Sequence, residues 1–260
     1  MVSPARGSGR SSGRGRGGDG AIARARRGGS VSVREARLHV EADDEAAARR
    51  VAELLAEAAG QGGEIVLTGG STPGRAYGLA AQLESNWSRA GVWWGDERCV
   101  PPDDGNSNFG LARKTLLEAL EEQPRAVHRI RGEDEPERAA RDYDAELRGM
   151  TFDLLLLGLG PDGHVASLFP NAPGLEEHAR LAIPAEPKLE PFVERVTLTP
   201  PALGSARLLV FLVTGEAKAQ AVERALAGPP SAAVPGSLIR AQAGETIAVL
   251  DRAAASRLRD

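Results

Sequence analysis

The chain has 260 residues, of which 42% are apolar and 26% charged. It is long enough to bury a sizeable core in one large α/β domain or two small ones. A single cysteine, Cys99, excludes an intrachain disulfide and is consistent with a reducing, cytoplasmic compartment. No apolar run approaches the ~20 residues that span a bilayer, so we expect no membrane partner.

The first thirty residues differ from the rest, with seven Arg, nine Gly and one acid, Asp19. They lack the apolar segment of a signal peptide and bury too little surface to fold, so we expect a disordered tail at 1–30. A nucleic-acid or membrane-surface arm and a transit peptide are alternatives. The net charge of −4 includes +7 − 1 = +6 from the tail, which leaves −10 for the body. So acidic a body is a poor polyanion binder, and we expect no nucleic-acid partner.

Strands and helices are expected to alternate from residue 31 onward. A first strand at 31–33 precedes a helix at 43–59, which starts with acids and ends at a glycine. The remaining predicted elements are strand 64–70, helix 73–85 opening at a proline, strand 91–97, helix 108–121, strand 126–132, helix 135–148, strand 152–158, strand 207–215, helix 216–228 and strand 245–251.

Two of these strands, FDLLLLG at 152–158 and RLLVFLVTG at 207–215, are almost continuously apolar. Such runs are typical of inner parallel strands covered on both faces. The sequence therefore predicts a single α/β domain over 31–260, with a mostly parallel open sheet and helices on both faces. Ligands bind such Rossmann-like sheets at the carboxyl ends of the strands. The loops TGGSTPG, GDERCVPPDDGNSN, GLGPDGH and TGEAK all follow predicted strands.

The stretch GLGPDG at 158–163 matches the dinucleotide pattern G-x-G-x-x-G. A pyrophosphate site also needs a full helix after the turn, whereas only HVASLF separates this turn from Pro170. Asp162 would in addition repel a pyrophosphate. We therefore favour another use for this turn.

The same turn carries His164, which can act as a general base near neutral pH. Asp162 could orient the imidazole or contact a substrate hydroxyl. The alternatives are an ordinary Asp-Gly turn and a histidine that satisfies a backbone group. Asp162 and His164 could also supply two ligands of a metal site. No further ligands are evident nearby in the sequence, so we expect no metal.

The loop TGGSTPG resembles an anion site, with backbone amides at a helix start and hydroxyl donors from Ser71 and Thr72. A simple capped turn is the alternative. Arg98 and Lys218 each follow a strand at the same edge of the sheet as this loop and favour the anion site. Each could instead be a surface charge paired with Asp96, Glu97 or Glu216. Together these parts suggest a pocket for one phosphomonoester beside one histidine.

The motifs TGGSTP, GDERCVPPDDGNSN, FDLLLLGLGPDGHVASLFP and RVTLTPPAL…VFLVTGEAK resemble the 6-phosphogluconolactonase family, in the family's order. The resemblance runs from about residue 33 to the C-terminus. The related glucosamine-6-phosphate deaminases share the DGH but continue with a further catalytic acid, where this chain has 167-SLFP-170. The family usually has Ser at Thr68 and Asp at Asn106.

The resemblance implies a fold of the glucosamine-6-phosphate deaminase/ribose-5-phosphate isomerase type. It also implies hydrolysis of 6-phospho-D-glucono-1,5-lactone in the oxidative pentose phosphate pathway, without a cofactor, in a cytoplasmic monomer or small homo-oligomer. His164 would activate water and Asp162 would assist. The residues expected to hold the substrate are Gly69, Gly70, Ser71, Thr72, Arg98, Asn108, Arg195 and Lys218. A deaminase and a non-catalytic phosphosugar sensor remain the alternatives.

Overall fold

The computed structural model describes Met1 and residues 35–258. Two parts of the sequence prediction, the tail at 1–30 and the strand at 31–33, lie outside the described residues.

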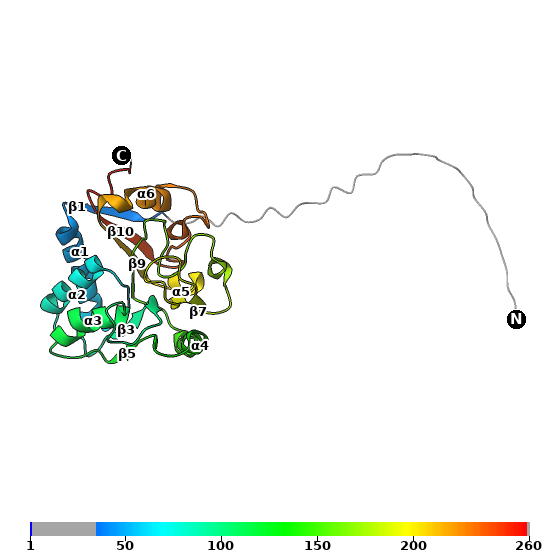
Figure 1. The fold of residues 1–260 in the computed structure, drawn as a ribbon, viewed down its shortest axis with the longest axis horizontal. Coiled ribbons are helices and arrows are strands. Elements are labelled where there is room, and N and C mark those ends of the chain that lie inside the picture. The colour runs from blue at the N-terminus through cyan, green and yellow to red at the C-terminus, as the bar shows by residue number, and fades with distance from the viewer. Residues whose placement is uncertain (2–34, 259–260) are drawn as a thin grey trace. The chain divides into compact units, whose positions relative to one another are not determined.

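A seven-stranded parallel sheet forms the centre of the described fold (Figure 1). Its strands, in spatial order, are β1 (Arg37–Glu41), β10 (Glu245–Asp251), β9 (Leu208–Val213), β6 (Leu154–Leu157), β2 (Glu64–Leu67), β3 (Gly91–Trp94) and β5 (Ala126–His128). Every neighbouring pair in this sheet is parallel. The predicted fold class is therefore confirmed.

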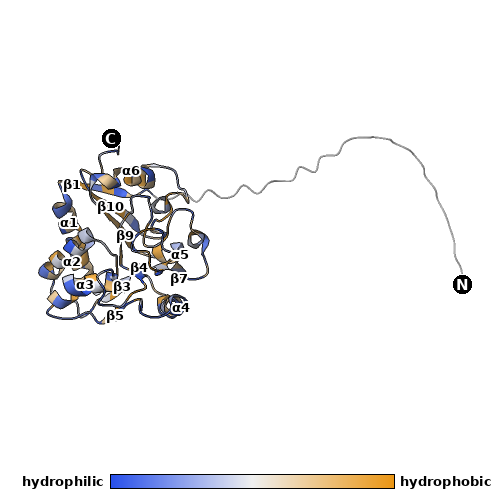
Figure 2. Ribbon diagram, viewed as in Figure 1, coloured by the Kyte–Doolittle hydropathy of each residue, from blue (hydrophilic) through white to orange (hydrophobic). Residues whose placement is uncertain are grey.

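The two most apolar strands, β6 and β9, lie side by side in the interior of the sheet, as predicted. All four residues of β6 are buried, and Figure 2 shows the hydrophobic colour following β9 and β10. β1 was not predicted, because it is an edge strand whose Leu38 and Val40 stay 43% and 51% exposed. Its sequence therefore lacks an apolar run.

Helices cover both faces of the sheet, as adjacent tryptophans of β3 demonstrate. Neighbouring residues of a strand point to opposite faces. Trp94 packs against Phe109 of α3, whereas Trp93 packs against Tyr143 of α4. The α-helices are α1 (Asp44–Gly60), α2 (Ser71–Leu83), α3 (Asn108–Thr115), α4 (Pro136–Leu147), α5 (Pro200–Leu203) and α6 (Ala219–Val222).

Capping residues set where the longer helices begin. The Asp43 side chain accepts a hydrogen bond from the Ala46 amide at the start of α1, and Glu135 caps α4, which opens with Pro136. α2 begins at Ser71, two residues before the predicted start at Pro73. The helix expected at 108–121 ends at Thr115 and is followed by the short 3₁₀ turn η1 (Leu117–Ala119).

A second sheet of three antiparallel strands was not predicted. It consists of β4 (Asp96–Arg98), β8 (Arg195–Leu198) and β7 (Ala182–Ala185). The predicted strand 91–97 divides at Gly95, whose amide donates to Leu67 of the large sheet while its carbonyl accepts from Leu198 of β8. Gly95 is thus the point where the chain passes from one sheet to the other.

The predicted helix at 216–228 is divided into three pieces. A 3₁₀ turn, η3 (Glu216–Lys218), leads into α6 and then a π-helical turn, η4 (Glu223–Ala227). Two further 3₁₀ turns are η2 (Pro173–Glu176) and η5 (Pro235–Ser237).

The strand order reverses between β2 and β6. From β2 the chain proceeds outward through β3 to β5, and from β6 it proceeds the other way to β9 and β10. In open α/β sheets, ligands bind outside the carboxyl ends of the strands at such a switch point. The loops that leave β2 and β6 are TGGSTPG and GLGPDGH, so the topology directs both to one place.

Candidate active site

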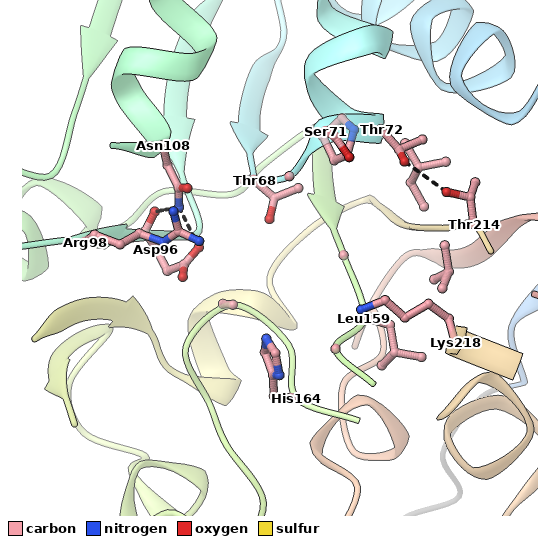
Figure 3. Close-up of a pocket in the computed structure, with 18 of the residues that line it drawn as sticks. Thr68, Ser71, Thr72, Asp96, Arg98, Asn108, Leu159, His164, Thr214 and Lys218 are labelled. Carbon is pink, nitrogen blue, oxygen red and sulfur yellow. Dashed lines mark hydrogen bonds between the residues drawn. The ribbon is translucent and has the colours of Figure 1, made fainter. Parts of the chain in front are cut away.

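A cavity of about 520 Å³ opens at this edge of the sheet. Figure 3 shows His164 projecting into it from below, Ser71 and Thr72 above, and Arg98 and Lys218 on opposite sides. The residues that line it are Asp44, Thr68, Gly69, Gly70, Ser71, Thr72, Pro73, Asp96, Arg98, Asn108, Gly158, Leu159, Gly160, His164, Ala166, Arg195, Leu212, Val213, Thr214 and Lys218.

His164 is fixed by the carboxylate two residues before it. Asp162 Oδ1 lies 2.6 Å from His164 Nδ1 and also accepts the His164 backbone N–H at 3.1 Å. Burial alone would raise the pKa of Asp162, but these hydrogen bonds and the charge of His164 outweigh it and lower the pKa below 3.8. An ionised carboxylate can only accept, so Nδ1 carries the proton and Nε2 is free to accept one.

Two of the three glycines in this turn have a structural reason to be glycine. A Cβ on Gly160 would overlap His164 Nδ1 and lie 2.7 Å from Asp162 Oδ1. Gly163 has φ of +91°, in the left-handed region that favours glycine. Gly160 therefore makes room for the imidazole and its carboxylate, and no helix follows the turn before η2.

Phe169 supports the histidine from the end of the same loop. Its ring centroid lies 4.9 Å from that of His164, and the Arg195 guanidinium sits 5.6 Å from the centroid of the Phe169 ring. The SLFP segment thus packs beneath one catalytic candidate and one binding candidate.

The TGGSTPG loop forms the amino-terminal end of α2, as expected for an anion site. Gly70, with φ of +115°, occupies the N-cap, and the Thr72 hydroxyl lies 2.9 Å from that of Thr214. A Cβ on Gly69 would overlap the side chain of Asn108. The loop can therefore approach α3 closely only because Gly69 has no side chain.

Arg98 and Arg195 face each other across the β4–β8 pair, with their residues in direct register. The Arg98 guanidinium donates to the Asn106 carbonyl, and that of Arg195 donates to the carbonyls of Leu189 and Pro191. Their buried Nε atoms have no hydrogen-bond partner. Burial, together with the charge of Arg98, lowers the pKa of Arg195 from its usual value. Two adjacent guanidinium groups of this kind favour an anionic ligand.

Lys218 reaches the cavity from η3. Burial lowers the pKa of its amine below 10.5, and the charge of Asp162 partly opposes this shift. Its loop is tied to the sheet by Asp251, whose two carboxylate oxygens accept the Gly215 N–H at 3.1 and 3.0 Å.

None of the three cations has a carboxylate within 4.0 Å among the described residues. The alternative that Arg98 pairs with Asp96 or Glu97, or Lys218 with Glu216, is therefore wrong for this structure. A cavity with three unpaired cations is suited to a multiply charged anion.

The structure brings nearly all the residues singled out from the sequence to one cavity. His164 and the eight binding candidates line it, whereas Asp162 lies outside the lining and contacts His164 instead. Sequence reasoning missed Asp44, Asp96 and Thr214 as lining residues. These three residues lie one to three positions after a strand that ends at this edge of the sheet. Their position after the strands could therefore have identified them as lining residues.

Two classes of feature are not found in the part of the chain that the structure describes. No cluster of three or more His, Cys, Asp or Glu side chains could hold a metal ion there. No helix formed by residues 35–258 is long and apolar enough to cross a membrane.

The sequence of residues 40–248 matches the family model described as glucosamine-6-phosphate isomerases/6-phosphogluconolactonase. The chain belongs to this family. A curated 6-phosphogluconolactonase of Streptomyces coelicolor is 39% identical over 236 residues, covering 82% of this chain and 89% of that protein.

Solved structures agree with this assignment of the family. The 6-phosphogluconolactonase from Trypanosoma cruzi has a TM-score of 0.77 and 26% identity, covering 88% of this chain and all of that one. A monomeric glucosamine-6-phosphate deaminase has a TM-score of 0.75 at 21% identity, covering 86% of this chain and all of that chain, which shows that the fold is shared.

Proposed function

We propose that this protein hydrolyses 6-phospho-D-glucono-1,5-lactone to 6-phosphogluconate, a step of the oxidative pentose phosphate pathway. The observation that carries the proposal is the cavity in which a carboxylate-held histidine faces three cations without carboxylate partners. Family membership and the names of the relatives support the same reaction.

His164 serves as the general base in this reaction. Its Nε2 takes a proton from a water molecule as that water attacks the lactone carbonyl, and Asp162 stabilises the imidazolium that forms. The tetrahedral intermediate then collapses: the bond between the former carbonyl carbon and the ring oxygen breaks, and the His164 imidazolium returns its proton to that oxygen, which leaves as a hydroxyl. Because water is the nucleophile, no covalent enzyme intermediate forms. A lactone is an activated ester, and one positioned base suffices.

The cations and the glycine loop hold the anionic part of the substrate. Arg98, Arg195 and Lys218 supply positive charge, and the amides of Gly70 and Ser71 at the start of α2 supply donors. Binding energy from this remote group holds the carbonyl carbon near His164. The reaction needs no cofactor, and we place the enzyme in the cytoplasm as a monomer or small homo-oligomer.

A paired assay separates this proposal from its nearest rival. The purified protein should consume the phosphorylated lactone faster than the spontaneous rate and release no ammonia from glucosamine 6-phosphate. Ammonia release without lactone hydrolysis would establish a deaminase instead. Binding of the phosphosugar with neither activity would establish a sensor.

A further inference from the structure

One buried carboxylate beside the cavity links the GDERCVPPDDGNSN segment to the histidine loop. Asp96 is 4% exposed and lies at the start of β4, next to the cavity. One carboxylate oxygen accepts a hydrogen bond from the first residue of α3, and the other accepts one from the histidine loop. Asp96 itself belongs to the GDER segment, which carries Arg98.

The first partner is Asn108, at the start of α3. Its Nδ2 donates to the Asp96 backbone carbonyl at 2.9 Å and to Asp96 Oδ1 at 3.1 Å (Figure 3). The other atom of the amide, Oδ1, packs against Gly69 so closely that a Cβ there would overlap it. Asp96 thus fixes the orientation of Asn108, and Asn108 in turn sets the position of the glycine loop.

The second partner is Ser167, three residues after His164. Its hydroxyl donates to Asp96 Oδ2 at 2.6 Å, and its backbone N–H donates to Thr197 Oγ1 at 3.1 Å. Ser167 is 1% exposed and is not among the residues that line the cavity. It therefore has no direct contact with a ligand in the cavity and connects its own loop, which carries the histidine, to Asp96.

We propose that Asp96 is a positioning residue that sets the separation between the base, His164, and the anion-binding glycine loop, with Ser167 as its anchor in the histidine loop. The inference rests on the proposed lactone hydrolysis. Both carboxylate oxygens of Asp96 accept hydrogen bonds from side chains that are themselves held in place, which suits a positioning role.

The proposal gives Ser167 a measurable role in turnover. Ser167→Ala removes the hydroxyl that joins the histidine loop to Asp96 and leaves every cavity side chain in place. A small displacement of a base lowers turnover steeply, so we expect kcat to fall on the order of 10-fold or more with little change in KM. Inorganic phosphate should bind the variant as tightly as the wild type, because Arg98, Arg195 and Lys218 are untouched.

The matched control is Thr246→Val in β10. Thr246 is 3% exposed, and its hydroxyl accepts a hydrogen bond from the Ala241 amide at the other end of the sheet. This variant also loses one buried hydroxyl hydrogen bond. Comparable thermal unfolding of the two variants, with normal kcat only in Thr246→Val, supports the proposal. An equal loss of kcat in both overturns it.

Two substitutions of Asp96 distinguish a positioning role from a role as a proton acceptor. Asp96→Asn can still accept from Asn108 and can donate to the Ser167 oxygen, so it keeps both connections. We expect its kcat to stay within about threefold of wild type with the same pH profile, whereas Asp96→Ala should lose kcat as Ser167→Ala does. A loss in Asp96→Asn as large as in Asp96→Ala would show proton transfer by Asp96 and overturn the positioning role.

The proposed function and this inference fail in different ways. A wild-type protein without lactone hydrolysis refutes the function. A wild-type protein that hydrolyses the lactone, together with a Ser167→Ala variant of normal kcat, refutes only the role of Asp96 and Ser167.

Discussion

His164 and Asp162 lie two residues apart in the sequence, but only His164 lines the cavity. The histidine faces the space where a ligand would bind, and the carboxylate lies behind it, on Nδ1. The sequence identified the pair from its place at a strand end, but left open whether Asp162 contacts substrate. Only the fold of the turn, with its bare Gly160, places Asp162 as the partner of the ring.

Substitutions of His164 and of Asp162 should lower turnover to different extents. His164→Ala removes the base and should lower kcat by about 10²-fold or more. Asp162→Ala leaves Nε2 in the cavity but frees the ring, so it should lower kcat by less. Steady-state kinetics on the phosphorylated lactone measure both, and a His164→Ala variant with near-normal kcat would contradict the role of the base.

Lys218 makes the anion site sensitive to alkaline pH. The Lys218 amine attracts an anion only while it is protonated and positively charged. Burial lowers the pKa of Lys218 below 10.5. Affinity for 6-phosphogluconate should therefore be full at neutral pH and weaken as pH rises, beginning before pH reaches 10.5.

Calorimetric titration of the product across this range tests the pH dependence, with Lys218→Arg as the matched variant. Arginine stays charged throughout, so the weakening should disappear in that variant. The same alkaline loss in both proteins would assign the effect to another group.

At the scale of elements, the inner strands could be predicted from sequence and the second sheet could not. β6 and β9 are apolar throughout because both faces are covered, which is a strong pattern. β7 and β8 have only four residues each, and β7 contains Pro184. At Gly95 the chain leaves the large sheet for the small one, and hydrogen bonds to β2 and β8 hold this residue. These bonds join segments far apart in the sequence, so the local sequence pattern does not predict them.

The loops at the carboxyl ends of the strands were predicted correctly because parallel order alone brings them together.

The glycines within these loops allow a test of how the turn positions His164. Gly160→Ala should displace the His164 ring and reduce kcat, since its Cβ would overlap Nδ1.

Gly78→Ala in α2 is the control for that substitution. Its added methyl group would meet only the Thr115 carbonyl oxygen, at 3.6 Å, and alanine favours a helix. We expect normal kcat and unchanged or slightly higher thermal stability. Normal turnover in Gly160→Ala would mean that the turn does not set the position of the histidine.

At the scale of the whole molecule, the chain combines a body of charge −10 with a tail of charge +6, as counted from the sequence. In the proposed function, the local cations of the cavity attract one small anion despite this acidic background. The prediction of disorder for residues 1–30 stays untested, because they lie outside the described residues.

Deleting residues 1–30 should leave both kcat and KM unchanged. Every residue that lines the cavity falls between Asp44 and Lys218, and the family match begins at residue 40. Kinetics of the shortened and full-length chains, measured side by side, test this. A raised KM in the shortened chain would give the arginine-rich tail a part in binding.

The most direct test of the central claim compares the lactone with and without its 6-phosphate. Hydrolysis of each is measured against buffer without protein, which supplies the spontaneous background. If the cations bind the remote phosphate as proposed, kcat/KM should favour the phosphorylated lactone on the order of 10²-fold or more. Equal values for the two lactones would contradict a phosphosugar lactonase.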